Sequence, residues 1–179
     1  MRFQNHIART TGFTPIELLV VIAIIGMLAS VVLSALNSAR GKANISAAQQ
    51  AITQINRAMY MLNSDTGMYP SFVDGVTDIC AAPSGTNEIA ANHANAGLVS
   101  NGRGWTGWSG PYIQNTVDPW GTPYYFDSDY DCTAGAVGCR GTANTGLSVI
   151  VSCGPDKDNS GSGGSCVYND DNIVSILCP

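Results

Sequence analysis

The residues with the clearest potential for chemistry lie near the C-terminal end of the chain, where Asp156, Asp158 and Ser160 alternate and Gly161 stands sixth. Oxygen ligands on alternate residues, with glycine at the sixth place for the turn, suit the hard cation Ca²⁺. The twelfth position holds Val167 rather than a glutamate, so the pattern is not an EF-hand. Further oxygen donors follow at Asp170, Asp171 and Asn172. The spacing alone leaves two alternatives, a calcium site and a solvated acidic loop.

All six cysteines lie within residues 67–179. No two of them have the C-x-x-C spacing of a thiolate metal site, so we expect disulfides and an oxidising compartment. Six cysteines allow many pairings, and their spacing leaves the connectivity open. The favoured set closes two short loops and one long one: Cys132–Cys139, Cys153–Cys166 and Cys80–Cys178.

Groups that serve catalysis are scarce. The chain has two histidines, and its glutamates are Glu17 and Glu88. It contains no nucleophile elbow, phosphate-binding loop or zinc motif. The net charge is −5, whereas nucleic-acid binding needs clustered lysine and arginine. We therefore expect neither an enzyme nor a nucleic-acid-binding protein.

An uncharged, mostly apolar segment runs from Leu18 to Ala39. Twenty-two residues at about 1.5 Å per residue span about 33 Å, enough to cross a bilayer core. A secretory signal peptide has a shorter apolar stretch, followed by a small-residue cleavage site that is missing here. The segment therefore predicts a membrane helix. Glu17, at its edge, either marks the end of the span or partners a positive group on another chain.

The residues around this glutamate resemble a known signal. Gly12-Phe13-Thr14-Pro15-Ile16-Glu17-Leu18-Leu19-Val20-Val21 is similar to the class III signal of type IV pilins and type II secretion pseudopilins. The resemblance implies that a prepilin peptidase cleaves between Gly12 and Phe13 and that the new Phe13 amine is methylated. It also implies that Glu17 neutralises the Phe13 amine of a neighbouring subunit. Pro15 stands where the family usually has leucine, and the first turn of a helix tolerates proline.

The helical pattern continues beyond the apolar segment. Thr66-Gly67 supplies a stop signal, with Pro70 after it, so one helix is predicted from about Thr14 to Ser64. Its polar half carries one apolar stripe, which we expect to pack on the chain's own globular part. The stripe comprises Ile45, Ala48, Ile52, Ile55, Met59 and Leu62. Such a helix resembles the pilin stalk.

Three short strands are predicted after the helix, at 123–127, 147–152 and 173–177. They indicate an α+β fold, a long helix packed on a small antiparallel sheet, and the resemblance implies the ladle-shaped pilin fold. Residues 71–117 show no clear period and are predicted to be a variable loop region. Trp105, Trp108 and Trp120 are interpreted as packing residues, with a ligand-binding surface as the alternative. The expected organisation is a leader at 1–12, a transmembrane helix at 13–40, an amphipathic half at 41–66 and an acidic β-domain at 67–179.

The C-terminal part carries a second resemblance. Asp118-Pro119-Trp120-Gly121, Ser152-x-Gly154-x-Asp156 and Asp170-x-Asn172-Ile173 resemble the major pseudopilin of type II secretion, in which the late loop binds structural calcium. Carried over, the side-chain ligands are Asp156, Asp170 and Asn172, and Cys153 and Asp158 also supply oxygens. Asn172 stands where the family has aspartate, and Ser160–Val167 is an insertion.

Together these patterns predict a structural subunit of a membrane-assembled filament, most simply a major pseudopilin for type II protein secretion. The alternatives are a type IV pilus subunit and a membrane-anchored calcium-binding domain that does not assemble. The expected partners are further copies of the chain, a prepilin peptidase, minor pilins and an assembly platform. The expected location is the inner membrane, crossed once, with the C-terminal domain outside the cytoplasm.

Overall fold

The computed structural model describes residues 12–70, 75, 77, 88–132, 144–158, 160 and 169–177, with backbone alone at 129, 131, 132 and 144–146. The contacts divide the chain into two compact units, Met1–Lys42 and Ala43–Pro179. Helix α1 (Pro15–Thr66) begins in the first unit and ends in the second. The prediction of one long helix is confirmed, with an end two residues beyond the predicted one.

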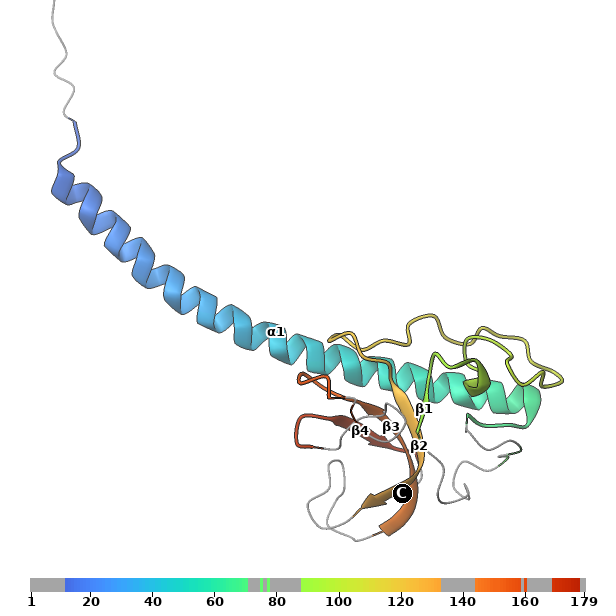
Figure 1. Cartoon of the computed structure of the whole chain (residues 1–179). Coiled ribbons are helices and arrows are strands. Elements are labelled where there is room, and N and C mark those ends of the chain that lie inside the picture. The colour runs from blue at the N-terminus through green and yellow to red at the C-terminus, as the bar shows by residue number, and fades with distance from the viewer. Residues whose placement is uncertain are drawn as a thin grey trace, which may run out of the picture. The chain divides into compact units, whose positions relative to one another are not determined.

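In the first unit, the part of α1 before Ala43 is exposed along its whole length (Figure 1). Its most apolar 18-residue window has a mean hydropathy of 2.8, and none of that window is buried. Among the described residues it is the one helix long and apolar enough to cross a membrane.

In the second unit, α1 buries one face against the sheet and the segment 88–117. The buried residues follow the 3-4 spacing of a helical stripe, and they are Ala48, Ile52, Ile55, Ala58, Met59 and Leu62. The stripe is thus confirmed except at its start, because Ile45 is 40% exposed. The apolar cluster begins one turn later, at Ala48, so it does not reach Ile45.

The end of α1 is set by Gly67. Its φ of +73° is in the left-handed region, and its N–H donates to the carbonyl of Asn63 at 2.7 Å. This is the glycine that terminates a helix, as the sequence predicts.

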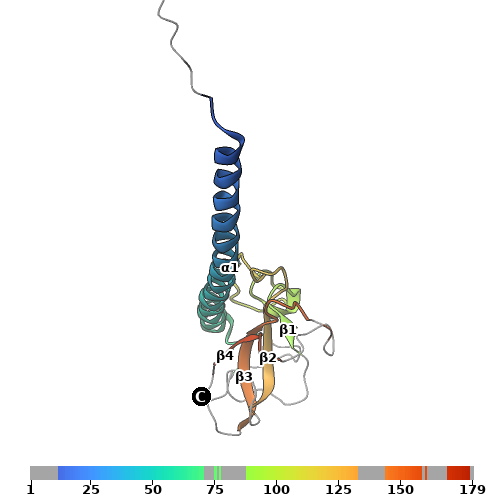
Figure 2. The ribbon, with the colours of Figure 1, turned by 90° about the vertical axis from the view of Figure 1, so that its left-hand side faces the viewer.

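Within the described residues, the sheet has four antiparallel strands in sequential order: β1 (Ile89–Ala90), β2 (Tyr125–Cys132), β3 (Asn144–Ser152) and β4 (Ile173–Ile176). Figure 2 shows β2 and β3 side by side, where Phe126 pairs with Ile150. The three predicted strands are confirmed, although β2 starts at Tyr125 and Pro123 forms an isolated bridge with Val117. The sequence did not predict β1, because two residues are too short to show a period.

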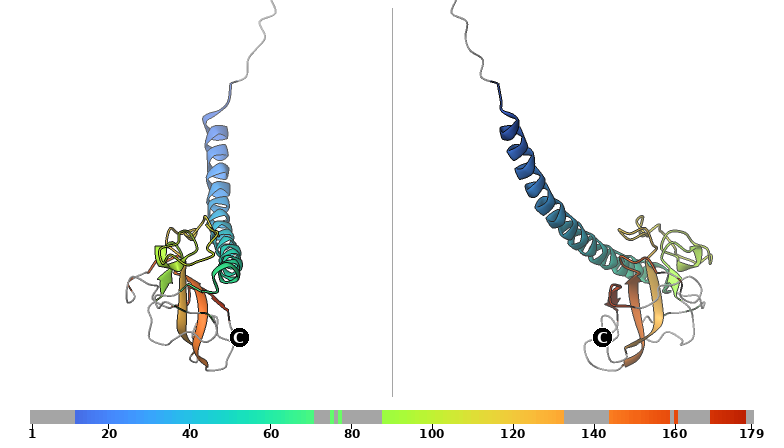
Figure 3. Two further views of the ribbon diagram at one scale, coloured as in Figure 1. Left: turned by 90° about the vertical axis from the view of Figure 1, so that its right-hand side faces the viewer. Right: turned by 60° about the vertical axis from the view of Figure 1, so that its left-hand side comes forward.

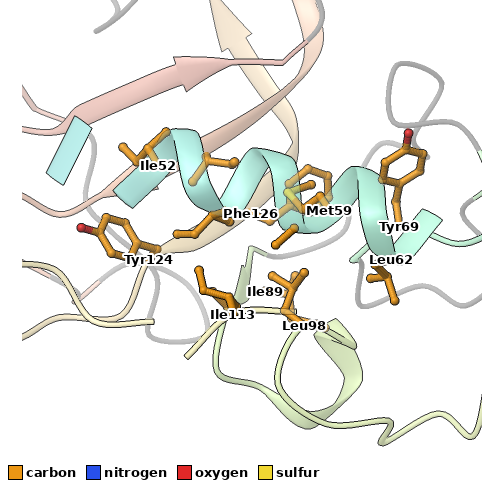
Figure 4. Packing of buried hydrophobic residues seen from close by; sticks show 14 of the residues in the cluster. Ile52, Met59, Leu62, Tyr69, Ile89, Leu98, Ile113, Tyr124 and Phe126 are labelled. Carbon is orange, nitrogen blue, oxygen red and sulfur yellow. The ribbon is translucent and has the colours of Figure 1, made fainter. Parts of the chain in front are cut away.

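The main core lies between α1 and the sheet (Figure 4). Phe126 of the sheet packs in one cluster with Met59 and Leu62 of the helix, which are fully buried, and Ile150 belongs to the same cluster. Because side chains alternate along a strand, the other sheet face carries its own small apolar clusters. They contain Tyr125, Tyr130, Leu147, Val149, Val151 and Cys153.

Residues 88–117, the continuous described part of the predicted loop region, are built into this core. This segment contains β1 and a short 3₁₀ helix, η1 (Ala94–Ala96), and it lies beside the end of α1 (Figure 3). Trp105 and Trp108 pack against the core, as does Trp120, which confirms their predicted packing role. Gly97 permits this packing, since a Cβ there would lie 2.4 Å from the Trp105 ring. The segment is therefore irregular in backbone but structural in role.

Candidate functional site

The start of α1 is a capping box. The Thr14 N–H and hydroxyl both donate to Oε2 of Glu17, at 2.7 and 2.8 Å, and the Glu17 N–H donates to the Thr14 hydroxyl at 3.4 Å. These bonds satisfy helix-start donors that have no partner inside the helix. Pro15 occupies the first helical position, where its missing N–H costs nothing. Glu17 therefore has a structural role that the sequence analysis missed, although T-x-x-E is the signal for it.

The residues of the predicted processing site precede this box. Gly12 and Phe13 lie outside the helix, and Phe13 is 93% exposed. Both residues are thus open to a large partner.

A buried carboxylate, Asp118, organises the turn before β2. Its Oδ1 accepts the backbone N–H groups of Trp120, Gly121 and Thr122 at 2.8–3.0 Å. Its Oδ2 accepts the Thr122 hydroxyl at 2.6 Å and the Ser152 hydroxyl at 2.7 Å. Asp118 is 5% exposed, so these five bonds replace its hydration. It connects the Asp-Pro-Trp-Gly turn to the end of β3, directly before the candidate calcium loop.

This carboxylate also acts on Tyr124, whose burial, followed by the charge of Asp118, raises its pKa to about 12. An unfolded tyrosine titrates near pH 10. Between about pH 10 and 12 the folded state therefore holds more protons than the unfolded state, and stability falls as pH rises. We expect Tyr124→Phe to flatten this part of the curve when the free energy of unfolding is measured from pH 9 to 12. An equally steep fall in the variant would contradict the assignment.

The loop after β3 folds back on residues 169–172. The Asn169 side-chain amide donates to Oδ2 of Asp156 at 2.6 Å, and the Asp156 N–H donates to Oδ2 of Asp171 at 3.2 Å. Gly154 has a φ of +76°, and a Cβ there would lie 2.2 Å from the Asp171 carbonyl oxygen. The two arms of the loop thus contact each other through backbone and side chains.

The predicted ligands are brought together only in part. Asp158 connects to Asp156 through its N–H, and hydrogen bonds from Ser160 lower the Asp158 pKa. Asn172 is buried, accepting the Asn169 N–H at 2.6 Å. Asp170 is exposed. Cys153 is buried and disulfide-bonded, while the predicted pairings involve residues outside the described ones.

The donors of this loop fit calcium in type, because all of them are oxygens. Their arrangement in the structure is not that of ligands around a bound ion. The described residues hold no group of three or more metal-binding side chains placed to hold a metal ion. The oxygens of Asp156 and Asn172 instead accept N–H groups of the loop itself. A bound ion would have to replace part of this network.

Three curated relatives share the name "Type II secretion system core protein G". The protein from Vibrio cholerae is 29% identical over 82% of this chain and 94% of its own length. That from Pseudomonas aeruginosa is 31% identical over 65% of this chain and 72% of its own. That from Escherichia coli is 32% identical over 63% and 68%. The chain belongs to the type II secretion system core protein G family.

Membership in the core protein G family confirms the resemblance, and the long helix on a small antiparallel sheet confirms the α+β pilin-like fold that it implied. Its relatives are named as core proteins of a secretion system and not as enzymes, which agrees with the expected lack of catalysis. No family model and no solved structure matches this core protein G chain.

Proposed function

We propose that the chain is a structural subunit of the pseudopilus of a type II secretion system. The observation that carries this proposal is its membership in the core protein G family, and the exposed apolar half of α1 supports it. The work is mechanical, since subunits pack into a filament that serves protein secretion. The three relatives are named as core proteins of type II secretion, and none of the three as a type IV pilus subunit or a calcium-binding anchor.

The proposal includes processing and assembly at the start of α1. A prepilin peptidase would cleave between Gly12 and Phe13 and leave a methylated amine on Phe13. The carboxylate of Glu17 would then neutralise that amine on a neighbouring copy, because an unpaired charge in a membrane is costly. The helix would cross the inner membrane once, with residues 43–179 on the outer side, next to an assembly platform and minor pilins.

Complementation tests this function. The full chain, including residues 1–12, is expressed in a bacterium whose type II secretion system is complete except for its deleted core protein G. We expect restored secretion and filaments visible by electron microscopy. A chain that enters the membrane but yields neither filaments nor secretion would overturn the proposal.

We also propose that the loop 153–172 holds a structural calcium ion. Asp156, Asp170 and Asn172 would supply side-chain oxygens, and Cys153 and Asp158 would supply further oxygens. A divalent cation there would offset the repulsion among the loop's aspartates and hold its two arms together. The all-oxygen donor set and the contact between the arms support this proposal.

The variant Asn172→Asp tests whether the two arms of the loop are held together by a calcium ion or by hydrogen bonds alone. The Asn172 amide donates to the Ser152 carbonyl at 3.5 Å, and an aspartate cannot make that bond. In EDTA, we expect the variant to melt about 2–4 °C below the wild-type chain. When calcium is added, the melting temperature of the variant should rise by more than that of the wild-type chain. Glu88→Gln, a charge removal outside the loop, should leave the calcium response unchanged. Identical melting with calcium and with EDTA would contradict the site.

A further inference from the structure

The last turn of α1 carries an aspartate held in a fixed position. Oδ2 of Asp65 accepts hydrogen bonds from the Ser109 hydroxyl and, at 2.8 Å, from the Tyr112 hydroxyl. The Ser109 N–H in turn donates to the Tyr112 hydroxyl at 3.0 Å. Tyr112 is braced by Trp108, whose ring meets it edge-on at a centroid distance of 5.9 Å. Asp65 is thus an exposed carboxylate on a rigid support.

One oxygen of the Asp65 carboxylate is available to a partner. This oxygen, Oδ1, has no hydrogen-bond partner among the described residues. The bonds from Ser109 and Tyr112 lower the pKa of Asp65, so it stays charged at neutral pH. A hollow of about 370 Å³ adjoins it. The hollow is lined by Met61, Ser64, Asp65, Ser109, Pro111 and Tyr112. Apolar and aromatic walls around one carboxylate suit a planar cation such as guanidinium.

A matching cation lies on the same helix. Arg57 is exposed and has no hydrogen bond or ion pair with the described residues. Of the other described cations of this unit, Arg103 donates to the Asn95 carbonyl, and Lys157 lies in the sequence between Asp156 and Asp158. Between Arg57 and Asp65 lie Tyr60 and Met61, which are 50% and 57% exposed. One stretch of α1 thus presents a cation, an apolar patch and an anion in order.

We infer that Arg57 of a second copy of this chain enters the Asp65 hollow and forms an ion pair there. The charges are complementary, and Tyr112 lines the hollow beside Asp65, so an entering guanidinium would contact an aromatic side chain. Copies that share a membrane through the N-terminal part of α1 must pack with parallel helices. Arg57 and Asp65 are eight residues apart, so the pairing requires a displacement of about 12 Å along α1.

This displacement makes the contact head-to-tail. Each copy uses Asp65 toward one neighbour and Arg57 toward another, so the contact does not close on itself and generates an open filament. The pairing would also cover part of the exposed Tyr60 and Met61 side chains. The inference rests on the proposed function, because it names a contact between filament subunits.

Charge exchange tests the pair in the full chain, in the complemented bacterium. We expect Arg57→Asp and Asp65→Arg each to lower the sheared filament fraction at least about tenfold, and the double exchange to restore it. Asp65→Asn keeps the bonds from Ser109 and Tyr112 while removing the charge, so its loss of filaments cannot be ascribed to misfolding. Lys42→Asp, the same charge reversal elsewhere on α1, is expected to assemble normally.

Cross-linking tests the direction of the contact. A chain with Thr53→Cys and Met61→Cys keeps Arg57 and Asp65, because these exposed positions have the same eight-residue separation. It should give a ladder of dimers, trimers and larger species, and dimers alone would overturn the head-to-tail arrangement. Normal filaments from Arg57→Asp would overturn the ion pair while leaving the pseudopilus function in place. A wild-type chain that forms no filaments would overturn the proposed function, and this contact with it.

Discussion

Replacing Glu17 with glutamine is expected to leave the chain in the membrane, with α1 intact, and to abolish filament assembly. Glutamine still accepts the hydrogen bonds of a capping box, so the helix start survives. What is lost is the negative charge that would neutralise the Phe13 amine of a neighbouring copy. A buried charge left without its partner costs about 3–5 kcal/mol, which corresponds to a loss of assembly of roughly a hundredfold or more. Membrane fractionation and electron microscopy measure the two outcomes separately.

Thr14→Val is the matched control, because it removes the hydroxyl of the cap and keeps the carboxylate. Loss of an N-cap costs about 1 kcal/mol, so this variant should still form filaments. Filaments of normal number from Glu17→Gln would show that the charge of Glu17 is dispensable. A defect in Thr14→Val as large as that in Glu17→Gln would show that assembly does not depend on the charge of Glu17 alone.

The second large effect is expected at Asp118. Asp118→Ala should lower the free energy of unfolding by about 3–5 kcal/mol, because three backbone N–H groups and two hydroxyls lose their common acceptor. In a domain of this size the melting temperature should fall by about 6–15 °C. Tryptophan fluorescence during denaturant unfolding of the full chain in detergent measures the loss.

Two further variants show whether the loss follows the hydrogen bonds. Asp118→Asn keeps an oxygen for the backbone N–H groups and should cost about half as much. Ser152→Ala removes a single bond and should cost about 1–2 kcal/mol. An Asp118→Ala chain within 1 kcal/mol of wild type would contradict the role of this carboxylate.

The sequence predicted the parts of the fold that have a period. The apolar segment and the stripe from Ala48 to Leu62 placed α1 almost to its ends, because helical spacing is a local property. Ile45 fits the same spacing but is exposed, since burial depends on where the partner surface begins. Strand β1 and the core residues of 88–117 carry no such period and could be located only in three dimensions.

The candidate sites also include some residues that a local sequence pattern indicates and others that no such pattern indicates. Spacing and resemblance name Asp156 and Asn172 as candidate calcium ligands, and this stays a prediction. The capping box at Thr14 and Glu17 has a sequence signal, T-x-x-E, that the sequence analysis missed. The bonds of Asp118 to Ser152 and of Asp65 to Tyr112 connect residues 34 and 47 positions apart. No local pattern encodes such a contact, because it depends on how the turn, the strands and the helix end come together.

The placement of residues 88–117 limits how the protein can be labelled. Removing this segment would take Ile89, Leu98 and Ile113 out of the core, so a shortened chain would lose folding as well as length. An epitope or fluorescent domain inserted there would disturb the same packing. Dyes for imaging growing filaments belong instead on single exposed side chains, of which Asn92 and Thr106 are suitable positions.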